Sequence, residues 1–378
     1  MSKILFGFIF ILFCNPMFSQ PIENIHFGSH GNPLNGLTVT WKSFGESDKI
    51  KWGYTEAFEM GEHAGIRRNN FEGYWFDYTF PIVKPLTEIY YSIFNSKENN
   101  WTQKIFKTST DTLSDNYTFT VTGDSRTRLN RWGQVANAIE KADFNIFTGD
   151  LVDKGSINYE WDNWFYCGEK FFTSNLVYYT IGNHDVGNNN YENILVMPTS
   201  PVGSELYYSF NYGNAAFICL NSENPTDSVQ LVWFRETLEN CKDKTWKFVF
   251  FHKPFYSSGS HQEAMHKYFD TWWKLLDDYG VDLVLTGHSH HYERTKPINR
   301  NISINSPVAE YGSTPDKGRC QIVAGGAGAP LYETKAQWFT AYTESIFHYC
   351  KVVVSGNELF FEAKNVDGKV IDSLRLVK

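Results

Sequence analysis

Polar residues that can bind metal ions lie at five short junctions along the chain. These junctions read Gly123-Asp124, Gly149-Asp150, Gly182-Asn183-His184-Asp185, His252 and Gly287-His288-Ser289-His290. Together they supply carboxylates, one amide and several imidazoles, a mixture of oxygen and nitrogen ligands that fits Fe, Zn or Mn. Two such ions held about 3.5–4 Å apart can neutralise phosphoryl oxygens and activate the water that cleaves a phosphoester. The series therefore predicts a two-metal, phosphoester-cleaving centre.

A two-metal centre needs one ligand that both ions share, and Asp150 is our candidate for this role. A bridging ligand must be a carboxylate, because a single imidazole nitrogen cannot hold two metals. The glycines that precede the polar residues permit tight turns that aim the next side chain inward.

Each junction follows a run that is typical of a β-strand. From about residue 116 to residue 378, apolar runs alternate with amphipathic stretches, which indicates a layered α/β domain. Ligands gather at the carboxyl ends of strands in such domains, because the loops converge there. The expected strands are Tyr117–Thr122, Phe144–Thr148, Val177–Ile181, Ala215–Leu220, Phe248–Phe251, Val281–Thr286 and Gln321–Ala324; the expected helices are Arg128–Lys141, Glu160–Phe172, Asp227–Lys242 and Gln262–Asp278.

The segment 20–110 shows a different pattern and is expected to be all-β. Short alternating or aromatic-rich runs, separated by turn-formers, predict a small β-sandwich in which Leu37–Trp41, Ile50–Tyr54 and Glu88–Phe94 are strands. A fibronectin-III-like module fits better than an immunoglobulin domain, because no cysteine lies between Cys14 and Cys167. The polar stretch Thr108–Asn116 is expected to link the two domains.

Residues 1–19 are expected to be a cleaved secretory signal. Lys3 precedes the apolar run Ile4–Phe13, which is too short to span a bilayer, and cleavage is expected near Ser19. We therefore expect a protein that is secreted, periplasmic or at the cell surface, without a transmembrane segment.

The composition and charge of the chain limit the kinds of binding partner that we expect. The chain has 378 residues, of which 42% are hydrophobic and 17% aromatic, enough for one large or two ordinary domains with sizeable cores. Its formal net charge is −8 and it has no long basic run, which argues against a constitutive nucleic-acid partner. A small phosphoester is the partner that the metal motifs predict. The oligomeric state is not predicted.

Removal of Cys14 with the signal leaves five of the 6 cysteines, an odd number. Two interpretations stay open: a disulfide between Cys320 and Cys350 on neighbouring strands, or five buried thiols. None of the cysteines has the CxxC spacing of a zinc site.

The order GD, GDxxD, GNHD, HxPxY and GHxHxYER resembles that of the calcineurin-like metallophosphoesterases. The segments His252–Ser258 and His288–Arg294 are closest to the purple-acid-phosphatase branch, and the runs LTVTW, IKWGY and DGKVIDSL are similar to the flanking parts of such enzymes. The resemblance covers nearly the whole chain after the signal. It implies a four-layer αββα catalytic domain behind the fibronectin-like module.

The resemblance also implies a division of the ligands between two metal ions. One ion would be held by Asp124, Asp150 and His290, and the other by Asp150, Asn183, His252 and His288.

Three further residues receive roles from the resemblance or from their position. His184 would be the acid that protonates the leaving oxygen, oriented by Asp185, and His261 would be a substrate-side histidine. A structural His184, which only supports neighbouring groups through hydrogen bonds, and a surface His261 are the alternatives.

The chain departs from the family pattern at two positions. Purple enzymes have a ligating tyrosine where this chain has Asp153, so a colourless or weakly coloured protein is expected. The wider superfamily often has a histidine where this chain has Arg126, which leaves three protein ligands for the first metal. Arg126 is expected to grip a phosphate oxygen bidentately; the alternative is a solvated surface charge.

The expected function is hydrolysis of phosphate monoesters by attack of a metal-bridging hydroxide, with His184 as general acid. A phosphodiesterase of the same fold is the first alternative. The alternative from another class is a non-catalytic cell-surface binding protein that uses its β-sandwich for adhesion.

Overall fold

The computed structural model describes residues 22–43, 49–68, 74–95, 99–109, 111–260, 268–300 and 306–378. The expected signal at residues 1–19 and His261 lie outside the described residues, as does the first part of the helix expected over Gln262–Asp278.

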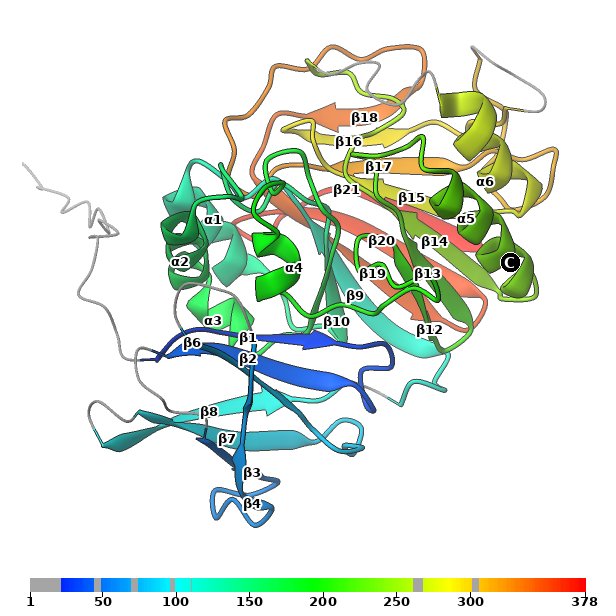
Figure 1. The fold of residues 1–378 in the computed structure, drawn as a ribbon. Coiled ribbons are helices and arrows are strands. Elements are labelled where there is room, and N and C mark those ends of the chain that lie inside the picture. Colours follow the sequence, from blue (N-terminus) through cyan, green and yellow to red (C-terminus); the bar gives the residue numbers. More distant parts are fainter. Residues whose placement is uncertain are drawn as a thin grey trace, which may run out of the picture.

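The N-terminal part of the chain is a sandwich of two four-stranded antiparallel sheets, coloured blue to cyan in Figure 1. The strand orders are β1-β2-β6-β5 and β4-β3-β7-β8. The three runs predicted as strands here are confirmed as β2, β3 and β7. The strands are β1 (Ile22–Ser29), β2 (Leu37–Ser43), β3 (Lys49–Gly53), β4 (Gly61–Ala64), β5 (Ile66–Arg67), β6 (Tyr74–Thr79), β7 (Glu88–Asn95) and β8 (Asn100–Lys107).

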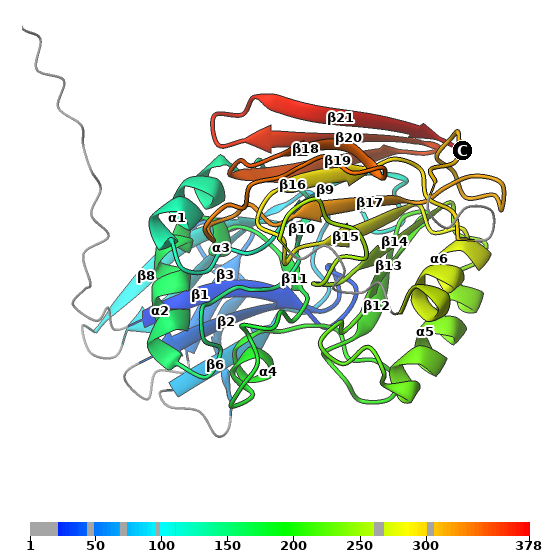
Figure 2. The same cartoon turned by 90° about the horizontal axis from the view of Figure 1, so that it is seen from above.

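Two larger sheets form the rest of the molecule. Their orders are β11-β10-β9-β19-β20-β21 and β12-β13-β14-β15-β17-β16-β18, with parallel pairing at β9-β10-β11 and at β13-β14-β15-β17. Figure 2 shows the C-terminal strands β19 to β21 side by side. The strands are β9 (Asn116–Thr122), β10 (Phe144–Phe147), β11 (Val177–Tyr179), β12 (Tyr208–Tyr212), β13 (Ala215–Cys219), β14 (Trp246–Phe250), β15 (Leu283–Thr286), β16 (Tyr292–Thr295), β17 (Cys320–Ala324), β18 (Thr340–Glu344), β19 (His348–Ser355), β20 (Glu358–Asn365) and β21 (Val370–Val377).

Helices cover the outer faces of both sheets, which gives the expected four-layer αββα arrangement (Figure 1). Helices α1 to α3 flank the six-stranded sheet, whereas α5 and α6 flank the seven-stranded one. Every run predicted as a strand after residue 116 is confirmed. The helices are α1 (Leu129–Ala138), α2 (Asn158–Cys167), α3 (Glu169–Phe172), α4 (Asn190–Ile194), α5 (Ser228–Asn240) and α6 (Lys274–Asp278), the last preceded by a π-helical turn at Phe269–Trp273.

Aromatic rings fill the space between the two large sheets. Phe119 of β9 and Phe144 of β10 face Phe217 of β13 and Phe248 of β14, with ring centroids 5.1–5.2 Å apart for Phe144–Phe217 and Phe119–Phe248. All four side chains are fully buried. Such ring pairs add to the free energy gained by burying apolar area, so this layer holds the two sheets in register.

Neighbouring residues of the seven-stranded sheet face opposite layers, as the two-residue period of a strand requires. Phe217 and Phe248 point to the inter-sheet core, whereas Ile218 and Val249 pack under α5 and α6. The strands are therefore apolar throughout, which explains why they read as continuous hydrophobic runs.

The N-terminal sandwich shares one continuous hydrophobic core with the catalytic sheets. Strand β1 packs on α2 and α3, and a backbone bridge joins Phe27 to Leu176 next to the edge strand β11. Lys42 of β2 donates to both carboxylate oxygens of Asp162 in α2, each at 2.7 Å. The sandwich is thus a packed part of the molecule.

The expected boundaries of two helices need correction. The helix expected over Glu160–Phe172 is two helices that meet at Gly168, where a Cβ atom would lie 2.6 Å from the ring of Phe172 and 2.9 Å from that of Trp132. The first helix ends at Ala138, before Lys141.

Of the two interpretations of the cysteines, the disulfide between Cys320 and Cys350 is wrong. The two residues lie on β17 and β19, which belong to different sheets, and both are free thiols. Of the five cysteines after Cys14, four are buried and Cys167 is half-buried.

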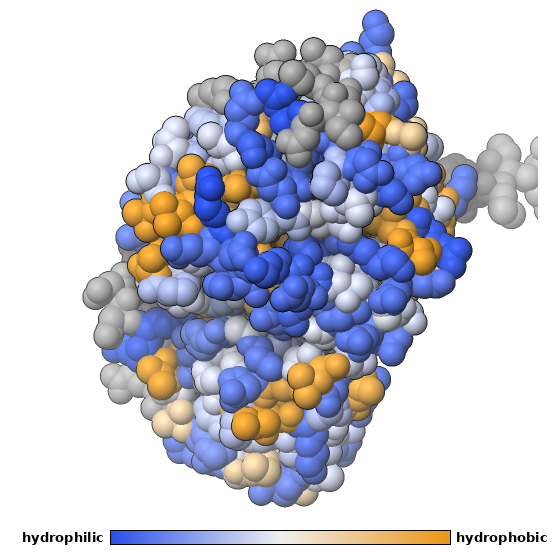
Figure 3. Space-filling view, turned by 90° about the vertical axis from the view of Figure 1, so that its right-hand side faces the viewer, coloured by the Kyte–Doolittle hydropathy of each residue, from blue (hydrophilic) through white to orange (hydrophobic). Residues whose placement is uncertain are grey.

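The face that carries α5 and α6 is largely hydrophilic, with separate apolar patches (Figure 3). None of the helices in the described part of the chain has the length and apolarity needed to span a bilayer.

Candidate metal centre

The carboxyl ends of β9, β10, β11, β14 and β15 converge, and the metal-binding residues predicted from the sequence meet there. The loops approach so closely that two positions admit glycine alone. A Cβ atom at Gly182 would lie 2.3 Å from the backbone nitrogen of Asp150, and one at Gly287 would lie 2.7 Å from the carbonyl oxygen of Thr148. These two glycines are needed for close approach of the loops, since neither has a positive φ angle.

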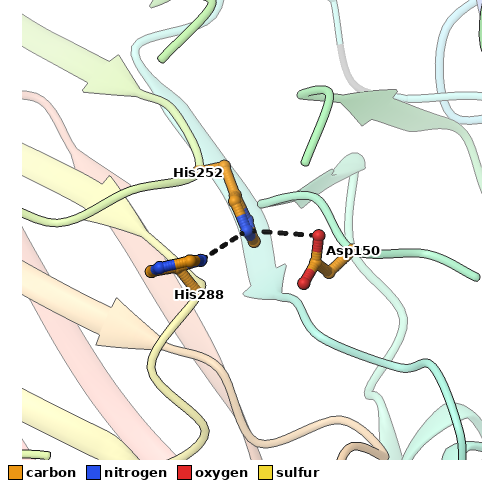
Figure 4. Close-up of side chains that lie close together, drawn as sticks. All are labelled: Asp150, His252 and His288. Carbon is orange, nitrogen blue, oxygen red and sulfur yellow. Dashed lines mark hydrogen bonds and ion pairs between the residues drawn. The ribbon is translucent and has the colours of Figure 1, made fainter. Parts of the chain in front are cut away.

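One cluster of ligand atoms is formed by Asp150, His252 and His288 (Figure 4). The ring of His252 lies between the other two: its Nε2 is 3.2 Å from Oδ1 of Asp150 and 3.1 Å from Nδ1 of His288. The Oδ1 atom of Asn183 lies 3.2 Å from the same Nε2. The structure thus brings together the four residues predicted for the second metal.

The other cluster is formed by Asp124, Asp150 and His290, all of them buried. Nε2 of His290 lies 3.6 Å from Oδ1 of Asp124. Oδ2 of Asp124 accepts a hydrogen bond from the backbone nitrogen of His288 at 2.8 Å. Asp150 belongs to both clusters, as a bridging ligand must.

These residues fit a pair of metal ions. Oδ1 of Asp124 is buried without a hydrogen-bond partner, a costly arrangement that a cation would relieve. Nδ1 of His252 faces the carbonyl of Thr148 at 2.8 Å, and Nδ1 of His290 faces the carbonyl of Pro330 at 2.9 Å. A carbonyl can only accept, so each Nδ1 donates; once Nε2 carries no proton, its lone pair points into the cluster, as in histidines that bind metals.

Burial and neighbouring charges shift the pKa values of these groups. Burial alone would raise the pKa of Asp150, but His252 beside it holds that pKa well below its ordinary value. Burial opposes protonation of His252, yet Asp150 and then Asp124 raise its pKa. Metal binding must displace this proton, so metal affinity falls as the pH falls.

The contact between Asp124 and His290 involves two groups that burial keeps neutral. Burial, with a smaller contribution from Asp150, raises the pKa of Asp124 well above its ordinary value. Burial and the charge of Arg126 lower the pKa of His290 to about 3. The pair therefore gains little from charge attraction, and a metal ion would have to displace the proton of Asp124.

Three candidate ligands have backbones in the left-handed region. The φ angles are 60° at Asp124, 53° at Asp150 and 67° at His288. This conformation is uncommon outside glycine and costs on the order of 1 kcal/mol or more at each position. The surrounding structure therefore holds these residues in place for a purpose other than stability.

His184 lies beside the clusters and is half-buried. Its Nδ1 is 2.8 Å from the carbonyl oxygen of Asp153, and its Nε2 is 4.0 Å from Oδ2 of Asp150. The ring thus presents Nε2 to the centre.

The structure corrects the expectation that Asp185 orients His184. The Asp185 carboxylate is fully buried and accepts hydrogen bonds from the backbone nitrogens of Gly182, Asp150, Leu151 and Val152. It therefore joins the loop after β11 to the loop after β10. The carbonyl of Asp153 orients the imidazole of His184 instead.

Arg126 points into the centre, and the reading of it as a solvated surface charge is wrong. Its side chain is 15% exposed and its guanidinium contacts Asp150, Asp153 and His290. Asp153 also accepts from Thr127 Oγ1 at 2.7 Å, so its carboxylate faces Arg126 and Thr127.

Sequence reasoning missed three groups that support the centre. The ring of Tyr332 stacks on His290 with centroids 4.2 Å apart, and the carbonyls of Pro330 and Thr148 fix two histidine rings. Backbone carbonyls leave no trace in residue types, and Tyr332 lies in a loop without periodicity. The sequence signal that could have pointed to this loop is its neighbour Pro330 together with the glycines at 325, 326 and 328.

Comparison with known proteins agrees with this geometry. Residues 117–292, which contain every residue of the two clusters, match the family model described as calcineurin-like phosphoesterase. The chain is 26% identical to a phosphoenolpyruvate phosphatase of Allium cepa, over 94% of this chain and 81% of that protein.

Two further similarities concern purple acid phosphatases. Purple acid phosphatase 18 of Arabidopsis thaliana is 30% identical over 49% of this chain and 46% of its own length. The solved structure of a purple acid phosphatase from yellow lupin (Lupinus luteus) seeds superposes with a TM-score of 0.77, at 21% identity, over 94% of this chain and 74% of that chain. The lupin structure shows that the fold is shared along almost the entire chain.

Proposed function

We propose that this chain, whose residues 117–292 match the model of the calcineurin-like phosphoesterases, is a metal-dependent phosphatase that hydrolyses phosphate monoesters. The observation that carries the proposal is the pair of ligand clusters that share Asp150. We propose further that the two sites hold two ions of Fe, Zn or Mn per chain. When bound, these ions would neutralise the phosphoryl oxygens and activate a water molecule.

The chain's own residues would bind and position these ions. Asp124, Asp150 and His290 would hold one, and Asp150 with Asn183, His252 and His288 the other. Thr148 and Pro330 fix the tautomers of His252 and His290 through their carbonyl oxygens, which keeps each Nε2 available as a ligand.

His184 would protonate the oxygen of the departing alcohol. With Nδ1 held by the carbonyl of Asp153, a protonated ring can deliver its second proton only from Nε2. That atom lies 4.0 Å from Oδ2 of Asp150, beside the clusters. General acids of this kind contribute about 10²–10⁴-fold to a rate.

Substrate contact and location complete the proposal. Arg126 would bind a phosphate oxygen, since its guanidinium lies against both clusters. His261 stays a proposed substrate-side residue.

We propose that the protein acts after export, with residues 1–19 as its signal and residues 20–110 as a fibronectin-III-like module before the catalytic domain of 116–378.

Hydrolysis of an aryl phosphate monoester and of the matching diester, by protein reloaded with metal, tests the proposal. We expect monoester turnover that Asp150→Asn abolishes, because this change removes the carboxylate that both clusters use. Preference for the diester would replace the phosphatase by a phosphodiesterase. Absence of turnover together with absence of bound metal would support a non-catalytic binding protein.

A further inference from the structure

The Arg126 guanidinium occupies the first cluster (Asp124, Asp150 and His290). Its Nε lies 3.3 Å from Oδ2 of Asp150, and its Nη2 lies 3.4 Å from Nε2 of His290. Its Nη1 reaches Asp153 at 2.9 Å and Thr127 at 3.1 Å. A permanent positive charge therefore stands against two of the three residues that offer ligand atoms in this cluster.

The contact between Arg126 and His290 uses the electron pair of His290 that would also bind a metal ion. Nδ1 of His290 faces the carbonyl of Pro330, so the single lone pair of the ring is on Nε2. That lone pair can accept from Arg126 or bind an ion, but it cannot do both. Like charges also repel strongly where the site is shielded from water.

In the second cluster (Asp150, His252 and His288, with Asn183), the contacts that the structure describes for Arg126 reach Asp150 but neither histidine nor Asn183. Arg126 touches Oδ2 of Asp150, whereas His252 faces Oδ1 of the same carboxylate at 3.2 Å. The two clusters also differ in number of ligands, because Asn183 belongs to the second.

We propose that Arg126 is a built-in cation that competes with the first metal, so that the two sites load in order. The second site fills first and tightly. The first site fills only when Arg126 turns away from Asp150 and His290, while Asp153 keeps hold of its Nη1. The inference rests on the proposed function, because it concerns metal sites that the same reaction uses.

A phosphate group would favour the fully loaded state. The displaced guanidinium keeps Asp153 but loses the carboxylate of Asp150, and a phosphate oxygen beside the first site can replace that partner. Binding of phosphate and of the first metal would then strengthen each other to the same extent, as linkage requires. Arg126 would thereby couple the presence of substrate to completion of the centre.

Titration of metal-free protein with Mn²⁺, followed by isothermal calorimetry, tests the inference without any activity measurement. We expect two sites of unequal affinity in the wild type. His290→Ala should remove the weaker site, and His288→Ala should weaken the tighter one, which assigns each affinity to a cluster.

Arg126→Gln is the deciding variant, because it removes the charge and keeps a polar side chain of similar shape. We expect it to raise the affinity of the weaker site by about tenfold or more and to leave the tighter site unchanged. Inorganic phosphate should strengthen the weaker site more in the wild type than in Arg126→Gln. Arg128→Gln is the matched control, since Arg128 is an exposed arginine two positions away.

The outcomes separate this inference from the proposed function. Two sites of equal affinity in the wild type, or an unchanged weaker site in Arg126→Gln, would overturn the role of Arg126 and leave the phosphatase standing. A wild-type chain that binds none of Mn²⁺, Zn²⁺ and Fe²⁺ would overturn both.

Discussion

Several histidines of the centre contact a backbone carbonyl through one ring nitrogen, which points the other ring nitrogen at the clusters. His252, His290 and His184 each place Nδ1 on a carbonyl oxygen, and each presents Nε2 to the site. A ring held in this way keeps one tautomer and one orientation. Small changes at these rings should therefore alter chemistry more than stability.

His184→Gln should slow the reaction most for substrates with poor leaving groups. Phenyl phosphate needs a proton on its departing oxygen, so its kcat should fall by about 10²-fold or more, whereas 2,4-dinitrophenyl phosphate should lose much less. Steady-state kinetics on both substrates checks this. His63→Gln, at an imidazole of the N-terminal sandwich, is the control. Equal losses on both substrates would mean that His184 is no acid.

Asp153 bears on the colour of the protein. Its carboxylate pairs with Arg126 and Thr127, and no phenolate stands at this position. Protein reloaded with ferric iron should therefore show no strong tyrosinate-to-iron band in its visible absorption spectrum. A strong band would refute this expectation, and its loss in Tyr332→Phe would identify Tyr332 as the source.

Among the secondary-structure elements, β19 links the catalytic sheet to the C-terminal hairpin. It begins at His348, which is fully buried and whose ring packs on Tyr292 with centroids 5.3 Å apart. Nδ1 of His348 faces the carbonyl of Ile346 at 2.9 Å, and Nε2 is buried without a partner. Protonation of this ring would place an uncompensated charge in the core.

The pH dependence of stability should reflect this histidine. Burial lowers the pKa of His348 from 6.5 to about 4, so the unfolded chain takes up a proton between these values while the folded chain does not. Stability is therefore complete above pH 6.5, and about 3 kcal/mol of it is lost as the pH falls to 4. Denaturant unfolding at pH 7 and pH 4 checks this. His348→Gln should lose correspondingly less over the same interval; an identical loss would contradict the account.

The strands and the order of the ligands could be predicted from sequence, because both depend on local patterns. Runs such as Phe248–Phe251 are apolar on both faces, and each candidate ligand comes directly after such a run. The break at Gly168 and the true partners of Asp185 could not be predicted. They depend on side chains and backbone groups that only the folded chain brings together, such as Trp132 beside Gly168.

On the scale of the whole molecule, polar contacts as well as the shared core tie the N-terminal sandwich to the catalytic domain. Arg68 pairs with Asp77 of β6 and donates to the carbonyls of Asn193 and Leu195, at the end of α4. Helix α4 follows the loop that carries Asn183 and His184. The sandwich therefore supports a segment that leads directly from the metal centre, a role that differs from independent adhesion.

Asp162→Asn should destabilise the whole chain. It removes the charge of the carboxylate that pairs with Lys42, whose side chain is 9% exposed, and we expect this loss to cost about 1–3 kcal/mol. Unfolding should stay a single transition because the core is continuous. Glu62→Gln, which breaks the exposed pair with Lys49 inside the sandwich, should change stability by no more than about 0.5 kcal/mol. Calorimetry that resolves two separate transitions in the wild type would show that the sandwich unfolds independently.

The metal content of the reloaded protein tests the central claim most directly. By elemental analysis after dialysis, the wild type should retain about two ions per chain and Asp150→Asn close to none, because both clusters use this carboxylate. Asp270→Asn, at an exposed carboxylate that pairs with Arg300, should retain the wild-type amount. A folded Asp150→Asn protein that still holds two ions, or a wild type that holds none, would contradict the shared two-metal centre.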